Sequence, residues 1–205
     1  MRKNAFTLAE VLITLGIIGV VSAMTIPTLV SRYHEDVYAT QLRKVYSELS
    51  QAVEKLLSES NAVSLNESRL RRDGAGYLLN NYFNVTKTCT NATISNCFAT
   101  NYISRNSATI AASSYVPAYS SCAMLSGGAS ICLGQLDSGN IPVAVDVNGP
   151  QGPNILGLDL FSMRITSNGK IDGAVTNTSN CANAQGYDNG ACFNKVVDAG
   201  WKIVR

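Results

Sequence analysis

An uncharged run of twenty residues, 11–30, constrains this chain more than any other feature. At about 1.5 Å per residue, a helix of this length covers about 30 Å, which matches the hydrocarbon core of a bilayer. The apolar character already begins at Phe6. We therefore expect one membrane-spanning helix over residues 6–30.

The charges on either side of this run set its expected orientation. Arg2 and Lys3 precede it, whereas Arg32 after it is followed by the acids Glu35 and Asp36. The more basic flank of a membrane helix stays in the cytoplasm. We expect a single-pass protein of the cytoplasmic membrane with its N-terminus inside and the bulk of the chain outside.

Glu10 is an acid at the start of this apolar segment. A carboxylate in hydrocarbon costs roughly 2.5–3.5 kcal/mol on insertion scales, so an acid there is expected to have a functional partner. A cation is the expected partner. The alternative is that Glu10 only reaches the membrane interface in the unprocessed chain.

The first residues form a recognisable leader. A short basic segment ends in the small residue Ala5, Phe6 follows it, and Glu10 is fifth from Phe6, while Pro27 interrupts the apolar helix. This pattern resembles the leader of the type IV pilin-like proteins, which include pilus subunits and type II secretion pseudopilins. The resemblance implies cleavage between Ala5 and Phe6 by a prepilin peptidase, which also methylates the new amine of Phe6.

The resemblance implies a structural subunit rather than an enzyme. Its expected partners are other copies or related pilin-like subunits, the prepilin peptidase, the membrane, and pilus or secretion assembly machinery. After extraction from the membrane the subunit would lie in a periplasmic or extracellular filament. There the Phe6 ammonium of one copy would neutralise Glu10 of a neighbour in a dry environment. Phe6, Glu10 and Pro27 are therefore the expected assembly residues.

Two other interpretations remain. Residues 11–21 followed by a small-residue site at 21–23 also fit an ordinary secretory signal, which would leave Met24 as the first residue. The acid at Glu10 and a helical pattern that continues past the apolar run argue against it. The second alternative is a membrane-tethered extracytoplasmic binding protein that does not polymerise.

Composition limits the remaining classes. The chain has 205 residues and 46% apolar content, enough for one membrane helix and one domain with a sizeable core. Loss of residues 1–5 lowers the basic residues from 16 to 14, which equals the 14 acids. Because the processed chain has equal numbers of basic and acidic residues, we do not expect a nucleic-acid partner. The sequence contains neither a nucleophile elbow nor a Walker loop, so no motif predicts catalysis.

Six cysteines follow the apolar run, and their even number fits an oxidising exterior. Fifteen connectivities are possible. The cysteines nevertheless fall in three close pairs, and we expect the bonds Cys89–Cys97, Cys122–Cys132 and Cys181–Cys192. Each would close a short loop and stabilise the fold by about 2–4 kcal/mol.

Beyond the membrane the pattern becomes that of an amphipathic helix. Apolar residues recur at steps of four and three, on one helix face: Tyr38, Leu42, Val45, Leu49, Ala52 and Leu56. We expect the helix to end near residue 58, with a kink or melted turn between Gly19 and Pro27. The expected segments are a leader (1–5), a transmembrane assembly helix (6–30), a stem helix (31–58) and a globular head (59–205).

The first half of the head has few regular patterns. Residues 58–121 are rich in Asn, Ser, Thr and Ala. We expect a short helix over residues 68–82 and otherwise loops held by cysteines.

The second half alternates with the period of strands. Residues 141–147 and 158–166 each predict a strand, and Asn168-Gly169 predicts a two-residue type I′ hairpin turn. Residues 193–197 and 201–204 are candidate edge strands. Strands that follow one long helix favour an α+β fold, with the helix covering one face of a C-terminal antiparallel sheet, as in pilins.

Oxygen-bearing side chains gather between the first two of these strands. Asp146, Asn148, Asn154 and Asp159 are candidate ligands for Ca²⁺, which takes several oxygens in flexible geometry. The alternative is a tight connection in which the side chains bond backbone donors. Major pseudopilins of type II secretion carry a calcium loop in a comparable region, and the strand after Asp159 resembles theirs. This likeness favours a pseudopilus subunit over a pilus subunit.

Overall fold

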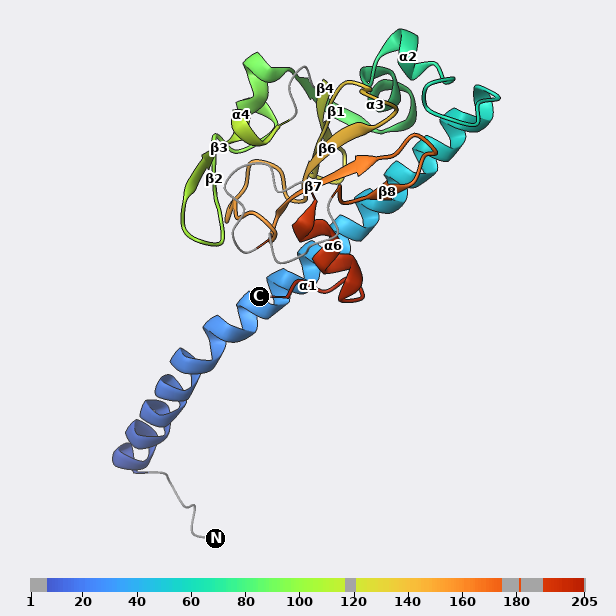
Figure 1. The fold of residues 1–205 in the computed structure, drawn as a ribbon. Coiled ribbons are helices and arrows are strands. Elements are labelled where there is room, and N and C mark those ends of the chain that lie inside the picture. The colour runs from blue at the N-terminus through green and yellow to red at the C-terminus, as the bar shows by residue number, and fades with distance from the viewer. Residues whose placement is uncertain (1–6, 117–120, 175–180, 182–189, 205) are drawn as a thin grey trace. The chain divides into compact units, whose positions relative to one another are not determined.

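The computed structural model describes residues 7–116, 121–174, 181 and 190–204. The chain divides into two compact units, Met1–Val37 and Tyr38–Arg205, which we describe separately. Helix α1 (Leu8–Glu59) contributes to both units (Figure 1). Its bounds agree with the predicted long helix.

In the first unit the apolar side chains of α1 are exposed. Among the large ones between residues 8 and 30, exposure runs from 44% at Val11 to 81% at Leu8. Within the described residues, α1 is the helix that is long and apolar enough to cross a membrane, with a best mean hydropathy of 2.1. The helix continues through Pro27, so the predicted melted turn is wrong.

In the second unit α1 presents an apolar face to the sheet. All six residues of the predicted face are buried, and Leu42, Leu49 and Leu56 are 0% exposed. A Cβ placed on Gly169 would meet the side chains of Leu57 and Val53 at 2.9 and 3.0 Å, so the sheet's last hairpin lies directly on the helix. The amphipathic period therefore identified the buried face correctly.

A six-stranded antiparallel sheet forms the core of this unit, in the order β1-β4-β5-β6-β7-β8. Its strands are β1 (Val85–Cys89), β4 (Ser121–Leu125), β5 (Ser130–Leu133), β6 (Ile141–Asp146), β7 (Leu160–Ile165) and β8 (Ile171–Asp172). A separate antiparallel pair consists of β2 (Asn101–Ile103) and β3 (Thr109–Ala111). The α+β class with a helix on an antiparallel sheet is confirmed.

The remaining helices are short: α2 (Leu70–Asp73), α3 (Gly76–Tyr82), the 3₁₀ helix η1 (Asn91–Asn96), α4 (Ala112–Tyr115) and α6 (Ala191–Asp198). The predicted helix over residues 68–82 is divided by Gly74, whose φ of +75° ends the first turn. Strands β1 to β3 fall in the segment that we expected to be loops. They are five, three and three residues long, which is too short to show a clear alternation.

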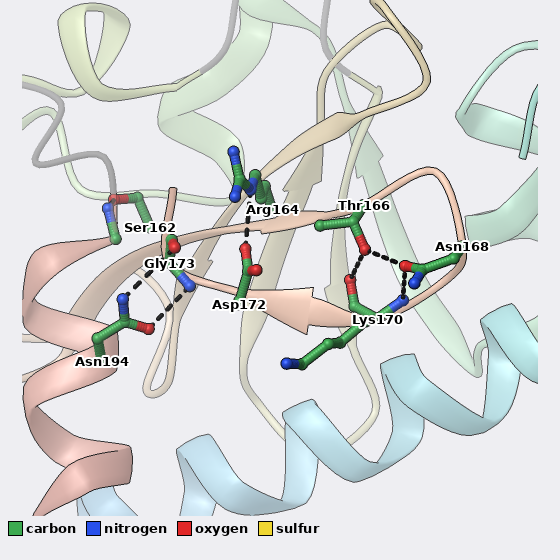
Figure 2. Close-up of polar contacts among 9 residues, drawn as sticks. Ser162, Arg164, Thr166, Asn168, Lys170, Asp172, Gly173 and Asn194 are labelled. Atoms are coloured by element: carbon green, nitrogen blue, oxygen red, sulfur yellow. Dashed lines mark hydrogen bonds and ion pairs between the residues drawn. The ribbon is translucent and has the colours of Figure 1, made fainter. Parts of the chain in front are cut away.

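The hairpin between β7 and β8 differs from the predicted turn. Gly169 has a φ of +81°, whereas Asn168 is not among the residues with positive φ, so a type I′ turn is wrong. Gly169 N donates to Thr166 O and Thr166 N donates to Lys170 O, both at 2.8 Å, which gives a three-residue loop. Figure 2 shows this turn, and Arg164 Nε donating to Asp172 Oδ1 at 2.8 Å across the two strands.

The two predicted edge strands at the C-terminus are wrong. Residues 193–197 lie in α6, where Phe193 and Val196 are buried on one helical face. Residues 201–204 lie in no strand. A short apolar run cannot be assigned to helix or strand by period alone. Asn194 of α6 accepts from Gly173 N at 2.8 Å, which fixes the helix beside β8 (Figure 2).

Three disulfides close short loops in the head. They join Cys89 to Cys97, Cys122 to Cys132, and Cys181 to Cys192. These are the pairs that the spacing predicts. Cys122 and Cys132 lie directly opposite each other on β4 and β5.

Candidate functional site

The predicted processing residues Ala5 and Phe6 lie outside the described residues, and the structure begins at Thr7. Thr7 and Glu10 form a reciprocal cap at the start of α1. Thr7 N donates to Glu10 Oε2 at 2.8 Å, and Glu10 N donates to Thr7 Oγ1 at 3.2 Å. The Thr7 hydroxyl also lies 2.9 Å from Glu10 Oε2.

This arrangement is a capping box, in which a Thr and a Glu three residues later satisfy each other's backbone N–H groups. Glu10 therefore has an uncharged partner, Thr7, in its own chain, in addition to any cation from a neighbour. The Thr-x-x-Glu spacing was the signal in the sequence. Oε2 receives the bonds from Thr7, and Oε1 makes no hydrogen bond to any residue that the structure describes.

The head contains the second group of predicted site residues, in the loop between β6 and β7. Asp146 ends β6, Asp159 immediately precedes β7, and Asp146 pairs with Leu160 across the sheet. Val147 N donates to Asp159 O at 2.9 Å. The antiparallel pairing thus brings both ends of the loop, and both acids, to the same end of the sheet.

The Asp146 side chain is fully buried, at 0% exposure. Its Oδ2 accepts the Tyr102 hydroxyl of β2 at 2.5 Å, and its Oδ1 accepts Asn148 N at 3.2 Å. Burial raises the pKa of Asp146 well above the ordinary value, and the charge of Asp159 raises it further, against the hydrogen bond from Tyr102. The two acids are therefore close enough to repel each other.

The Asp159 side chain is also 0% exposed and accepts two backbone bonds. Asn154 N and Ile155 N donate to its Oδ2 and Oδ1, each at 2.6 Å. Burial raises the pKa of Asp159 to about 6, although these backbone donors act in the opposite direction. The predicted alternative, side chains that bond backbone donors, thus describes this end of the loop.

The two asparagines of the predicted site, Asn148 and Asn154, each have a side-chain oxygen without a hydrogen-bond partner among the described residues. Asn148 Nδ2 donates to the carbonyls of Gln151 and Gly152 at 2.9 and 3.0 Å. Asn148 Oδ1 and Asn154 Oδ1 are buried and have no hydrogen-bond partner among the described residues. A buried acceptor without a partner costs about 1–3 kcal/mol, so each needs a donor or a cation.

The donor chemistry of this loop fits a hard cation. Two buried carboxylates that repel each other and two amide oxygens without partners are the ligand types that Ca²⁺ takes. Each carboxylate oxygen already accepts at least one hydrogen bond, and a carboxylate oxygen has two lone pairs. In the described ranges no group of three or more acidic, histidine or cysteine side chains that could hold a metal gathers, and this loop has only two acids, so the amide oxygens would have to complete the ligand set.

Two tyrosines that the sequence did not indicate also belong to this site. Tyr102 comes from β2, and Tyr38 of α1 lies with its hydroxyl 3.5 Å from Asn148 Nδ2. Burial raises the pKa of Tyr38, and the charges of Asp159 and Asp146 raise it further. Both contacts span long stretches of sequence, so no local pattern could have revealed them.

The comparisons with known proteins bear on the leader. A family model described as the prokaryotic N-terminal methylation motif matches residues 1–26. Comparison with curated proteins and with solved structures gave no match. The matched segment includes the predicted processing residues and Glu10, and it ends just before Pro27.

Proposed function

We propose that this chain, whose residues 1–26 match the prokaryotic N-terminal methylation motif, is a structural subunit of a type IV pilus-like filament or a type II secretion pseudopilus. Prepilin peptidase cleaves it before Phe6, and the subunit then assembles through its N-terminal helix. The observation that carries this proposal is the exposed apolar surface of α1 behind a methylation leader. Such a surface needs lipid or neighbouring helices to cover it.

Glu10 pairs with a neighbouring subunit during assembly, and its capping bonds to Thr7 are compatible with this pairing. In the filament, the ammonium of a mature Phe6 lies beside Glu10 of a neighbouring copy. Oε2 keeps its bonds to Thr7, while Oε1 receives the ammonium. The pair neutralises both charges among packed helices and fixes their register.

Two substitutions separate the charge from the cap. Glu10→Gln keeps the capping box, because Gln serves at the same position, but removes the charge. Thr7→Ala removes the hydroxyl and keeps the charge. We expect Glu10→Gln to abolish filament assembly in cells and Thr7→Ala to retain it. Equal assembly of Glu10→Gln and the parent would contradict the proposed pair.

Photo-crosslinking distinguishes the filament from a tethered binding protein. A photoreactive residue replaces Ile18, which is 60% exposed on α1. A subunit that assembles gives a ladder of crosslinked multimers, and Glu10→Gln removes the ladder. Monomers alone in the parent, under conditions where the filament machinery is expressed, would favour the tethered protein.

Within this class we prefer a pseudopilus subunit. The support is the loop between Asp146 and Asp159, with its calcium-type donors. Deletion of the gene is expected to stop secretion of exoproteins and to leave surface pili intact. Loss of pili with normal secretion would assign the chain to a pilus instead.

Calcium binding by the loop is a second proposal, carried by the two amide oxygens without partners. Asp146, Asn148, Asn154 and Asp159 supply the ligands. The bound ion removes the repulsion between the two acids and stabilises the connection between β6 and β7. At a hundred times the dissociation constant, calcium would add about 2.7 kcal/mol to the free energy of unfolding.

Calorimetry on the full chain in detergent micelles tests this binding. Asn154 has a φ of +58°, so Asn154→Gly removes the amide oxygen without straining the backbone. Asn61→Gly is the matched control, at an exposed position with a φ of +48°. We expect saturable calcium heat in the parent and in Asn61→Gly, and weak binding in Asn154→Gly. No calcium heat in the parent would refute the site.

A further inference from the structure

A large polar hollow lies on the head, apart from both sites described above. Its volume is about 920 Å³, within the range of ligand sites in proteins. Residues of helices α2 and α3 line it together with Ser121 at the start of β4 and with Gly134, Gln135, Leu136 and Ser138 after β5. Neither the leader nor the calcium loop contributes to it.

Four amide side chains belong to the lining: Asn66, Asn80, Asn81 and Gln135. Asn81 Nδ2 donates to Tyr77 O at 2.8 Å. The other three amides are exposed and make no hydrogen bond to the described part of the chain. An amide offers a donor and an acceptor side by side, which is the arrangement that neighbouring hydroxyl groups on a ring require.

The charge of the hollow is small and localised. Arg72 is bound to Asp73 through Nε–Oδ1 and Nη2–Oδ2 contacts of 2.8 and 3.1 Å. This bond lowers the pKa of Asp73 and neutralises the pair. Arg71 lines the same hollow and forms no ion pair within the described ranges. One guanidinium is therefore left to bind a carboxylate in the forked geometry that Arg favours.

Tyr77 is the main apolar group of the lining. It is half-buried, whereas Leu70 and Ala75 are only 1% and 7% exposed and offer little surface to a ligand. Arg69 Nη1 donates to the Tyr77 hydroxyl at 3.4 Å, which holds the ring in place. Gly74, between α2 and α3, has open space where a Cβ would stand. A ring with C–H faces and hydroxyl edges matches both kinds of surface.

We propose that this hollow binds an acidic oligosaccharide. Arg71 binds a sugar carboxylate, the amides of Asn66, Asn80 and Gln135 bind ring hydroxyls, and Tyr77 contacts a ring face. A phosphate polymer fits less well, because it carries one charge per unit and needs several cations, whereas the lining offers neutral amides and one guanidinium outside an ion pair. The site goes beyond assembly, and binding does not require a filament.

Titration calorimetry with the full chain in detergent micelles tests the site. The probe is tetragalacturonate, the neutral comparison is maltotetraose, and the phosphate comparison is a short oligothymidylate. We expect tetragalacturonate to bind and both comparisons to bind at least about tenfold more weakly. Asn80→Ala and Arg71→Gln should each weaken tetragalacturonate binding, by about tenfold for the arginine.

Arg43→Gln is the matched control. It removes the same charge from an exposed position on α1, outside the lining, and should leave binding unchanged. Near-ultraviolet circular dichroism confirms that each variant folds. No binding of tetragalacturonate, equal binding of maltotetraose, tighter binding of oligothymidylate, or unchanged binding by Arg71→Gln would each overturn the proposal. Since monomers suffice, failure here leaves the assembly proposal intact.

Discussion

The Tyr102 hydroxyl donates a hydrogen bond to Asp146 Oδ2 at 2.5 Å, across 44 residues of sequence. Tyr102 belongs to the small β2–β3 sheet and Asp146 to the main sheet, so the bond links the two. Both residues are 0% exposed. Burial raises the pKa of Tyr102, and the charge of Asp146 raises it further, which keeps the hydroxyl protonated as the donor.

Removing this donor should destabilise the head. Tyr102→Phe leaves a buried carboxylate oxygen without its partner, and we expect the free energy of unfolding to fall by about 1.5–3 kcal/mol. The measurement is denaturant unfolding of the full chain in micelles. Tyr33→Phe is the control, because Tyr33 is 66% exposed, and it should change stability by less than about 0.5 kcal/mol. Equal losses in the two variants would show that the bond contributes nothing.

Stability should depend on pH through Asp159. Burial raises its pKa from the ordinary 3.8 to about 6, so the folded chain holds this proton where the unfolded chain has lost it. The resulting stabilisation is complete below about pH 4 and is lost as the pH rises through 6. At about 1.4 kcal/mol per pH unit, the difference is about 3 kcal/mol at most.

Unfolding of the full chain in EDTA at pH 4.5 and pH 7.5 measures this dependence. We expect greater stability at pH 4.5 for the parent, and a smaller difference for Asp159→Asn. Saturating calcium should also reduce the difference, since the ion compensates the charge at pH 7.5. A parent that is more stable at pH 7.5 in EDTA would contradict the buried acid.

Gly157 lies against the disulfide that holds α6. Its φ is +74°, and a Cβ there would lie 2.7 Å from Cys192 Sγ and 3.0 Å from Cys181 Sγ. Gly157→Ala combines backbone strain with a clash, and we expect a loss of about 3 kcal/mol. Gly200→Ala isolates the strain, because Gly200 has a φ of +69° and open space, and should cost about 1–2 kcal/mol. Similar losses in both would exclude the clash.

The cap at the start of α1 should be measurable by hydrogen exchange. Thr7→Ala removes the side-chain acceptor for Glu10 N, at a cost of about 0.5–2 kcal/mol to the helix start. We expect amide exchange near residues 8–11 of the full chain in micelles to rise by about two- to thirtyfold. Glu10→Gln should change it less, because Gln retains the box. The reverse order would argue against the cap.

Long periodic elements were predictable from the sequence. The stem face was predictable because six apolar residues follow the helical period, and all are buried. The strands at β6 and β7 and the three disulfides followed from alternation and close spacing. Each of these signals is local and is repeated over several residues.

Other features depend on contacts that no local pattern records. The partner of Asp146 comes from Tyr102, far away in the chain, and α6 is helical because Phe193 and Val196 pack against the head. The turn after β7 is not the predicted type I′ turn, because that type needs a positive φ at Asn168 as well as at Gly169. The capping box is an exception, because the Thr7-x-x-Glu10 spacing is a local pattern that predicts it.

The identity of the mature N-terminus tests the central claim most directly. Mass spectrometry of the exported protein, digested and sequenced from its first peptide, reports where the chain begins and whether its amine is methylated. We predict a first residue of N-methylated Phe6, which supplies the ammonium for Glu10 of the next subunit. A product that still begins at Met1, or that begins at Met24, would contradict both the processing and the assembly proposed here.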